Sequence, residues 1–263
     1  MKVIEYGQEN KNTLAIFQCA LEPGWAFDAS AGMLAGTFHV FLFVADGHDE
    51  QGTEYVSVEK NAEDAVRYLR SRGIEQLDLL YGVSMGGASA MVLLAYEMMP
   101  VKKAVVDAGI TPYPYPKWVC RIIAFKDLVT MWLGTRSLGI MKMAMPPEKW
   151  TPAGEDPEEH YAKIFEFTKK LTARTIYNVF WSANNYSMPE VMPELETEME
   201  YWYGEKEKKA RKDNIAYAKQ AFPHMVIREF EGLEHGELVM MDPVRFRDEI
   251  LRVWSGGEQE DGA

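Results

Sequence analysis

The chain has 263 residues, of which 47% are hydrophobic and 26% charged, with 40 acidic against 28 basic side chains and a formal net charge of −12. This length and apolar content are typical of one large domain or of a domain with an insertion, and they argue against a disordered chain. The acidic balance argues against nucleic acid or an anionic membrane as the natural partner.

Other features of the sequence narrow the class of protein further. No apolar run reaches the roughly 18–20 residues that span a bilayer, and residues 1–5 lack the apolar segment of a signal peptide, so we expect a cytoplasmic protein. Cys19 and Cys120 have no CxxC spacing, and the five histidines have no HExxH spacing. The sequence therefore predicts no disulfide framework, no metal site and no cofactor.

The first hundred residues alternate short apolar runs with helical patterns, which is typical of βαβ units in a largely parallel sheet. Between the second and third runs, Ser57 is placed as an N-cap and Gly73 as a stop, which predicts an amphipathic crossover helix. The predicted strands are 14–17, 39–44, 77–81 and 103–106.

The alternation stops after Val106. Three prolines at every second position within 111–117 fit neither a helix interior nor a central strand, so we expect the chain to leave the sheet there. The segment 111–195 is helical in pattern, is nearly neutral, and holds 13 of the 32 aromatic residues and 6 of the 16 methionines. We therefore expect a helical insertion at 111–195, with 1–110 and 196–263 forming the core domain.

The last part of the chain returns to α/β alternation. Alternating side chains predict a strand over 195–203, and a second strand is predicted over 225–230. A helix is expected from Pro243 to about Trp254, because Asp242 offers a cap and proline suits the first turn. Residues 255–263 are polar and glycine-rich and predict a frayed tail.

Residues 82–87, Gly-Val-Ser-Met-Gly-Gly, follow the third predicted strand directly and precede a helical pattern. This is the Gly-x-Ser-x-Gly pattern in a strand–turn–helix context, where small flanking residues relieve the crowding of a sharp turn. The turn would present the Ser84 hydroxyl at a helix N-terminus, where Met85 N–H can stabilise an oxyanion. An ordinary glycine-rich turn is the alternative.

A serine nucleophile needs a base and a carboxylate that orients it. His235 lies between two glycines after the last predicted strand and is the candidate base, whereas the other four histidines are expected to be structural or solvent-facing. Glu207, a few residues beyond a predicted strand end, is the candidate acid. Asp107 is the alternative acid because it also follows a strand, and Glu205 and Asp213 are lesser rivals.

On these residues the chain resembles the α/β-hydrolase superfamily, and more narrowly its capped bacterial serine hydrolases with a helical lid. The resemblance rests on segments 45–49, 82–87, 203–207 and 232–237. It implies a mostly parallel sheet flanked by helices, with an inserted helical cap. It also implies that Ser84 is the nucleophile, Glu207 the orienting acid and His235 the general base.

The chain departs from that family after the first predicted strand. Members usually carry a His-Gly pair there, whereas this chain has Gln18-Cys19. The following Ala20 or Leu21 can still supply the second oxyanion N–H, because a backbone donor does not depend on its side chain. A glutamate in place of the commoner aspartate is a smaller departure.

The sequence thus predicts a carboxylesterase-like serine hydrolase that cleaves a small, uncharged or apolar carboxylic ester through an acyl-enzyme on Ser84. The aromatic and methionine-rich insertion favours such a substrate. Thioester, amide and carbon–carbon bond cleavage stay open, as does a noncatalytic ligand-binding or scaffold protein on the same fold. The expected partner is a small-molecule substrate, and the oligomeric state is open, a homodimer included.

Overall fold

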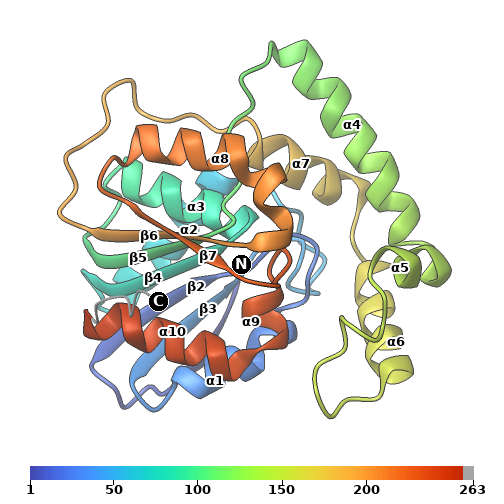
Figure 1. Ribbon diagram of the computed structural model, residues 1–263, viewed down its shortest axis with the longest axis horizontal. Helices are drawn as coiled ribbons and strands as arrows, with labels where there is room; N and C mark the ends of the chain where they lie inside the picture. The colour runs from blue at the N-terminus through green and yellow to red at the C-terminus, as the bar shows by residue number, and fades with distance from the viewer. Residues whose placement is uncertain (257–263) are drawn as a thin grey trace.

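The computed structural model describes residues 1–256 and contains a seven-stranded sheet with helices on both faces (Figure 1). The strand order is β1-β3-β2-β4-β5-β6-β7. Only β1 pairs antiparallel, and every other neighbouring pair is parallel. The strands are β1 (Lys2–Tyr6), β2 (Asn12–Phe17), β3 (Phe38–Val44), β4 (Leu77–Val83), β5 (Val101–Asp107), β6 (Glu198–Gly204) and β7 (Val226–Phe230).

Helices cover the sheet in two groups. One group packs on one face and comprises α2 (Val58–Ser71), α3 (Met85–Ala95) and α8 (Lys208–Ala221). The other face carries α1 (Asp28–Leu34), α9 (Glu237–Met241) and α10 (Pro243–Ser255). Within β2, Leu14 and Ile16 join the core of the second group, whereas Ala15 and Phe17 join that of the first. A strand buried on both faces needs apolar residues at every position, which explains the continuous apolar runs in the sequence.

The predicted crossover helix is confirmed as α2. The Ser57 hydroxyl accepts a hydrogen bond from Lys60 N–H at 3.2 Å, which caps the first turn. Gly73 adopts a φ of +77°, a conformation that favours glycine and ends the helix.

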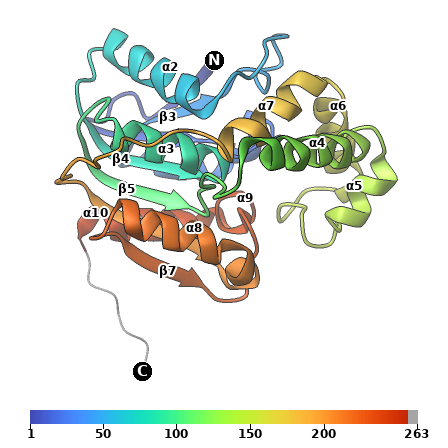
Figure 2. The same cartoon turned by 90° about the horizontal axis from the view of Figure 1, so that it is seen from above.

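Within residues 1–256, the segment between β5 and β6 holds four helices. These are α4 (Lys117–Gly134), α5 (Leu138–Ala144), α6 (Pro157–Thr168) and α7 (Ala173–Ala183). They lie beyond the carboxyl ends of the strands, and α4 extends away from the sheet (Figure 2). Of these four helices, α7 packs on α2 and α3. We call residues 111–195 the insertion.

The structure differs from the sequence predictions at some element boundaries. The strand predicted over 195–203 begins only at Glu198, because the ladder with β5 starts at the pair Lys103 and Glu198. The edge strand β1 and the short helix α1 were not predicted. The predicted tail lies outside the described residues except for Ser255 and Gly256, which end α10. Over residues 1–256, no helix is both long and apolar enough to cross a membrane.

Candidate active site

Ser84 occupies the sharp turn between β4 and α3. Its φ and ψ are +57° and −114°, a backbone conformation that an L-residue rarely adopts and that costs roughly 1–3 kcal/mol. The surrounding backbone holds it there, since Ser84 N–H donates to the Asp107 carbonyl at 2.8 Å and the Ser84 carbonyl accepts from Ala88 N–H. The residue is 7% exposed. The serine is therefore presented at the carboxyl edge of the sheet, at the start of α3.

Glycine is required on both sides of this serine. A Cβ on Gly86 would lie 2.2 Å from the Phe17 carbonyl oxygen, and one on Gly82 would lie 2.4 Å from the Gly86 carbonyl oxygen. Both contacts are with backbone atoms, which cannot move aside cheaply. Crowding by backbone atoms thus explains both glycines of the Gly-x-Ser-x-Gly pattern, as the sequence predicted.

His235 lies in the loop between β7 and α9, and its side chain is 39% exposed. Its Nδ1 is 2.8 Å from Glu207 Oε2, so Nδ1–H donates to the carboxylate and Nε2 is left as the basic nitrogen. A Cβ on the next residue, Gly236, would lie 3.9 Å from Val83 Cγ2, which places this loop beside the residue that precedes Ser84. Among the residues described, Ser84 Oγ and His235 share no hydrogen bond, and such bonds often tighten only when substrate binds.

Glu207 ends the short 3₁₀ helix η2 (Glu205–Glu207) that follows β6. It is buried, and Gly204 N–H donates to its Oε1 at 3.2 Å. Arg211 Nε lies 3.0 Å from the same Oε2 that His235 contacts. The carboxylate is therefore fixed by the backbone and by a cation while it faces the imidazole.

Asp107 and Glu205 make hydrogen bonds to groups other than His235. Asp107, at the end of β5, accepts a hydrogen bond from Tyr81 OH at 2.6 Å and is not hydrogen-bonded to His235 within residues 1–256. Burial raises the pKa of Asp107 to about 6, and the nearby Glu207 carboxylate adds to the rise. Glu205 accepts Gly232 N–H at 2.9 Å, and Asp213 is exposed on α8. Within residues 1–256, His235 is thus hydrogen-bonded to Glu207 and to none of these three, although Asp107 lies near enough to feel the charge of His235.

On the opposite side of Ser84, residues 18–25 follow β2. Leu21 has a φ of +63°, and its N–H donates to His48 Nε2 at 2.9 Å. His48 Nδ1 in turn lies 3.1 Å from the Asp46 carbonyl oxygen, which fixes the tautomer. Burial lowers the pKa of His48 to about 4, so the ring is neutral and can accept. Leu21 N–H is therefore already bonded to His48. Of the two predicted backbone donors to the oxyanion on this loop, Ala20 N–H remains.

The contact between His48 and Leu21 was missed by sequence reasoning, which expected this histidine to be structural or solvent-facing. It is fully buried and structural. The two residues are 27 positions apart, and one of them takes part only through its backbone, so no side-chain pattern could have linked them. The only available signal was the position of segment 45–49 directly after β3, at the same sheet edge as Ser84.

Comparison with known proteins supports the fold. No family model and no curated protein sequence matches the chain. Its structure resembles an α/β-hydrolase family protein from Desulfitobacterium hafniense, with a TM-score of 0.71 at 17% identity over 96% of this chain and 99% of the other. The chain has the α/β-hydrolase fold. The predicted fold class, with its mostly parallel sheet flanked by helices, is confirmed.

Two further similar structures are esterases. A thermophilic esterase from Thermogutta terrifontis gives a TM-score of 0.72 at 14% identity, covering 97% of this chain and 93% of the other. A carboxylesterase of the archaeon Nitrososphaera gargenis gives 0.69 at 16% identity, covering 98% and 96%. At these identities the likeness concerns the fold.

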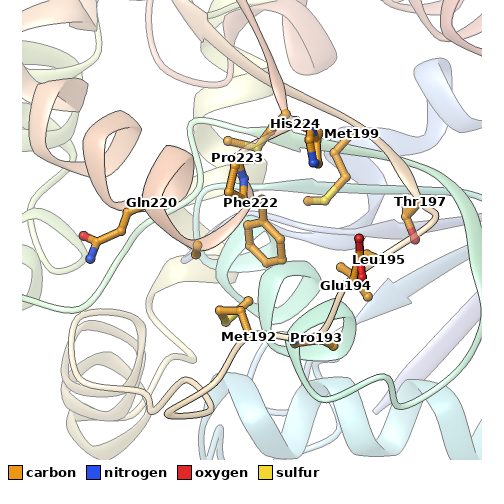
Figure 3. Close-up of a pocket in the computed structure, with 12 residues that line it drawn as sticks. Met192, Pro193, Glu194, Leu195, Thr197, Met199, Gln220, Phe222, Pro223 and His224 are labelled. Carbon is orange, nitrogen blue, oxygen red and sulfur yellow. The ribbon is translucent and has the colours of Figure 1, made fainter.

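A second cavity lies away from Ser84. The part of the chain that is described contains no group of three or more histidine, cysteine, aspartate or glutamate side chains placed to hold a metal ion. A cavity of about 260 Å³ lies between the segment 192–199 and the end of α8, with His224 on its wall (Figure 3). It adjoins the amino end of β6, whereas Ser84 lies at the carboxyl edge, so it is separate from the candidate active site.

Proposed function

We propose that this protein is a serine hydrolase that cleaves a small carboxylic ester through an acyl-enzyme on Ser84. The observation that carries the proposal is the placement of the strained Ser84 at the same sheet edge as the hydrogen-bonded pair His235 and Glu207. A hydroxyl is a weak nucleophile until a base takes its proton, and this pair has the orientation that such a base needs. The names of two similar structures, esterase and carboxylesterase, favour esters as the substrate class.

In this mechanism His235 Nε2 removes the Ser84 proton as Oγ attacks the ester carbonyl. Glu207 accepts the Nδ1 hydrogen bond throughout and stabilises the imidazolium that forms. The oxyanion is held by Met85 N–H, at the N-terminal end of α3, together with Ala20 N–H. His235 then protonates the leaving alcohol, and water, activated by the same imidazole, releases the acid.

The insertion acts in this proposal as a cap over the site. It lies beyond the carboxyl ends of the strands, where Ser84 and His235 also lie. Its helices carry exposed apolar side chains, among them Trp118, Ile122 and Phe125 on α4. A cap of this composition would cover the apolar part of an ester and exclude water from the reaction.

The test is labelling with a fluorophosphonate probe together with hydrolysis of p-nitrophenyl esters of graded chain length. We expect wild-type protein to be labelled and active, and Ser84→Ala to lose labelling and at least 10³-fold of the rate. Circular dichroism would show that the variant keeps its fold. A wild-type protein that neither labels nor hydrolyses any ester would refute the proposal and favour a noncatalytic binding protein.

A further inference from the structure

A cavity of about 230 Å³ lies between the insertion and the core, apart from the Ser84 turn itself. On the core side its lining includes Glu22, from the loop that follows β2, and on the insertion side it includes His160 from α6. The rest of the wall is mainly apolar. The lining includes Glu22, Trp25, Trp150, Glu155, His160 and Met240.

The cavity adjoins both halves of the proposed site. Glu22 is two positions after Ala20, the proposed oxyanion donor, on the same loop. Met240 belongs to α9, and its Cε would lie 3.0 Å from a Cβ on Gly236, the residue after His235. The cavity is therefore lined by the same two chain segments that carry the proposed oxyanion donor and the proposed base.

Two polar groups of the wall have no partner. Within residues 1–256, no hydrogen bond or ion pair engages the Glu22 carboxylate, whose pKa burial raises to about 7. His160 has a side chain that is 2% exposed, and its Nδ1 faces Glu155 Oε2 at 2.7 Å. The opposite ring nitrogen, Nε2, is buried and lacks a partner in the same part of the chain. A buried polar atom is normally hydrogen-bonded, so His160 Nε2 calls for a partner, and the partly exposed Glu22 carboxylate lines the same cavity without one.

The chemistry of these groups selects the ligand. With Nδ1–H of His160 donated to Glu155, this tautomer offers Nε2 as an acceptor, and above about pH 7 the Glu22 carboxylate also only accepts. No lysine or arginine belongs to the described lining of the cavity, whereas Glu22 and Glu155 do. Lys163 stands over the Trp25 ring at 5.0 Å and Lys149 over the Trp150 ring at 5.6 Å, and neither lysine lines the cavity. Two acceptors, two lining carboxylates and indole rings that already attract cations together favour a cation that carries several N–H donors.

We propose that this cavity binds a primary ammonium group on one arm of the ester, held by the Glu22 carboxylate and His160 Nε2 between Trp25 and Trp150. The inference rests on the proposed hydrolase function and specifies its substrate class as an amino ester. A volume of 230 Å³ suits an ammonium group on a short alkyl chain. The ammonium supplies the positive charge that the Glu22 carboxylate has no partner for. This amino ester replaces the uncharged or apolar ester that the sequence composition favoured as the substrate.

The first experiment measures binding without catalysis. Tryptophan fluorescence of wild-type protein is titrated with n-butylammonium and with 1-butanol, which has the same chain length but no charge. We expect n-butylammonium to bind at least 10-fold more tightly, and Glu22→Gln to remove that preference. Glu148→Gln removes an exposed charge of the insertion outside the cavity lining and should keep the preference. Equal binding of the two probes by the wild-type protein would overturn the inference, even if Glu22→Gln did not fold.

The second experiment compares methyl 6-aminohexanoate with methyl heptanoate in a pH-stat assay. We expect a KM at least 10-fold lower for the amino ester in wild-type protein, and no such difference in Glu22→Gln. Fluorophosphonate labelling of Ser84 separates the two proposals. Labelling without a preference for the amino ester refutes the ammonium site alone, whereas a protein that binds n-butylammonium and does not label supports the site and refutes the hydrolase.

Discussion

The two loops that flank Ser84 are held in different ways. The loop that carries His235 is held by charged side chains, since Glu207 binds the imidazole and Lys149 of the insertion pairs with Glu234 and Glu237. The loop after β2 is held by buried neutral contacts, chiefly the hydrogen bond from Leu21 N–H to His48. Half of the proposed machinery thus depends on charged contacts, of which those of Lys149 are partly exposed and that of Glu207 is buried. The other half depends on a buried imidazole that stays neutral.

This difference matters because the two kinds of contact respond differently to change. A charge near solvent can be screened by salt or replaced by water, so its loss costs little unless it touches the reacting groups. A buried hydrogen bond has no such substitute, and removing one partner leaves the other unsatisfied at a cost of about 1–3 kcal/mol. Substitutions in the two loops should therefore separate effects on catalysis from effects on stability.

The largest expected effect is on the His235 side. Glu207→Gln should lower kcat about 10³–10⁴-fold, because the amide no longer selects the tautomer with Nδ1 protonated. Asp107→Asn should change kcat less than 10-fold, since that carboxyl bonds Tyr81 rather than the histidine. Steady-state kinetics of the two near-isosteric variants measures this. A collapse in Asp107→Asn beside an unchanged Glu207→Gln would transfer the acid role to Asp107.

The second prediction concerns His48. His48→Phe should reduce the free energy of unfolding by about 1–3 kcal/mol, because Leu21 N–H is left buried without an acceptor. We also expect kcat to fall about 10–100-fold, because the loop that carries the Ala20 donor is no longer fixed. His48→Gln retains an acceptor and should recover part of both losses. If urea denaturation and kinetics show His48→Phe to be as stable and active as wild type, the buried contact does not organise this loop.

The elements that the sequence predicted well are those with a local cause. Ser84 is recognisable because the close approach of the backbone at Gly82 and Gly86 leaves room for nothing larger than glycine. Central strands such as β4 are recognisable because both faces are buried, which forces a continuous apolar run. Glu207 was predicted from its position just beyond β6, and the structure places it beside His235.

The elements that were missed depend on contacts across the chain. The edge strand β1 has only partly buried or exposed residues, so its sequence does not need the apolar pattern that predicts a buried strand. The alternation of side chains begins at Leu195, before the first residue that pairs with β5. The start of β6 is therefore set by the pairing with β5 and not by the local sequence. The cavity around Glu22 is closed by the insertion more than a hundred residues later, and no local signal reports it.

The third prediction uses the opposite pKa shifts of Glu22 and His48. Glu22 has a folded pKa of about 7 against its ordinary value of 4.5, so the folded state holds its proton more tightly and stability falls as pH rises from about 4.5 to 7. His48 has a folded pKa of about 4 against 6.5, so the folded state resists protonation and stability falls as pH drops from about 6.5 to 4.

Variants separate these two contributions. Glu22→Gln should be about 1–3 kcal/mol more stable than wild type at pH 8 and equal to it at pH 4, because the cost of burying the carboxylate is absent. His48→Gln should lose less stability than wild type between pH 6.5 and pH 4. Urea denaturation at several pH values measures both. A wild-type stability that stays flat from pH 5 to 8 beside an identical Glu22→Gln curve would contradict the Glu22 shift.

The smallest expected effect is at Lys149, which links the insertion to the His235 loop. Its Nζ lies 2.7 Å from Glu234 Oε1 and 3.0 Å from Glu237 Oε2, and Glu237 Oε2 also accepts Glu234 N–H. The pKa of Lys149 is raised, with burial opposing the rise and the two carboxylates outweighing it. These contacts surround His235 in the sequence without touching its ring, so Lys149 is a positioning residue in the proposed mechanism.

Lys149→Met should lower kcat about 2–5-fold and stability by less than about 1 kcal/mol, because a partly exposed ion pair contributes little to folding but here fixes the loop of the base. The matched control is Lys142→Met, which removes a pair with Glu158 inside the insertion and should leave kcat unchanged. Raising the salt concentration should reduce wild-type kcat toward that of Lys149→Met and barely affect the variant, since screening weakens the same contact. Equal kinetics of the two variants would show that the charged contacts at Lys149 do not position His235, and the contrast between the two loops would then rest on Glu207 alone.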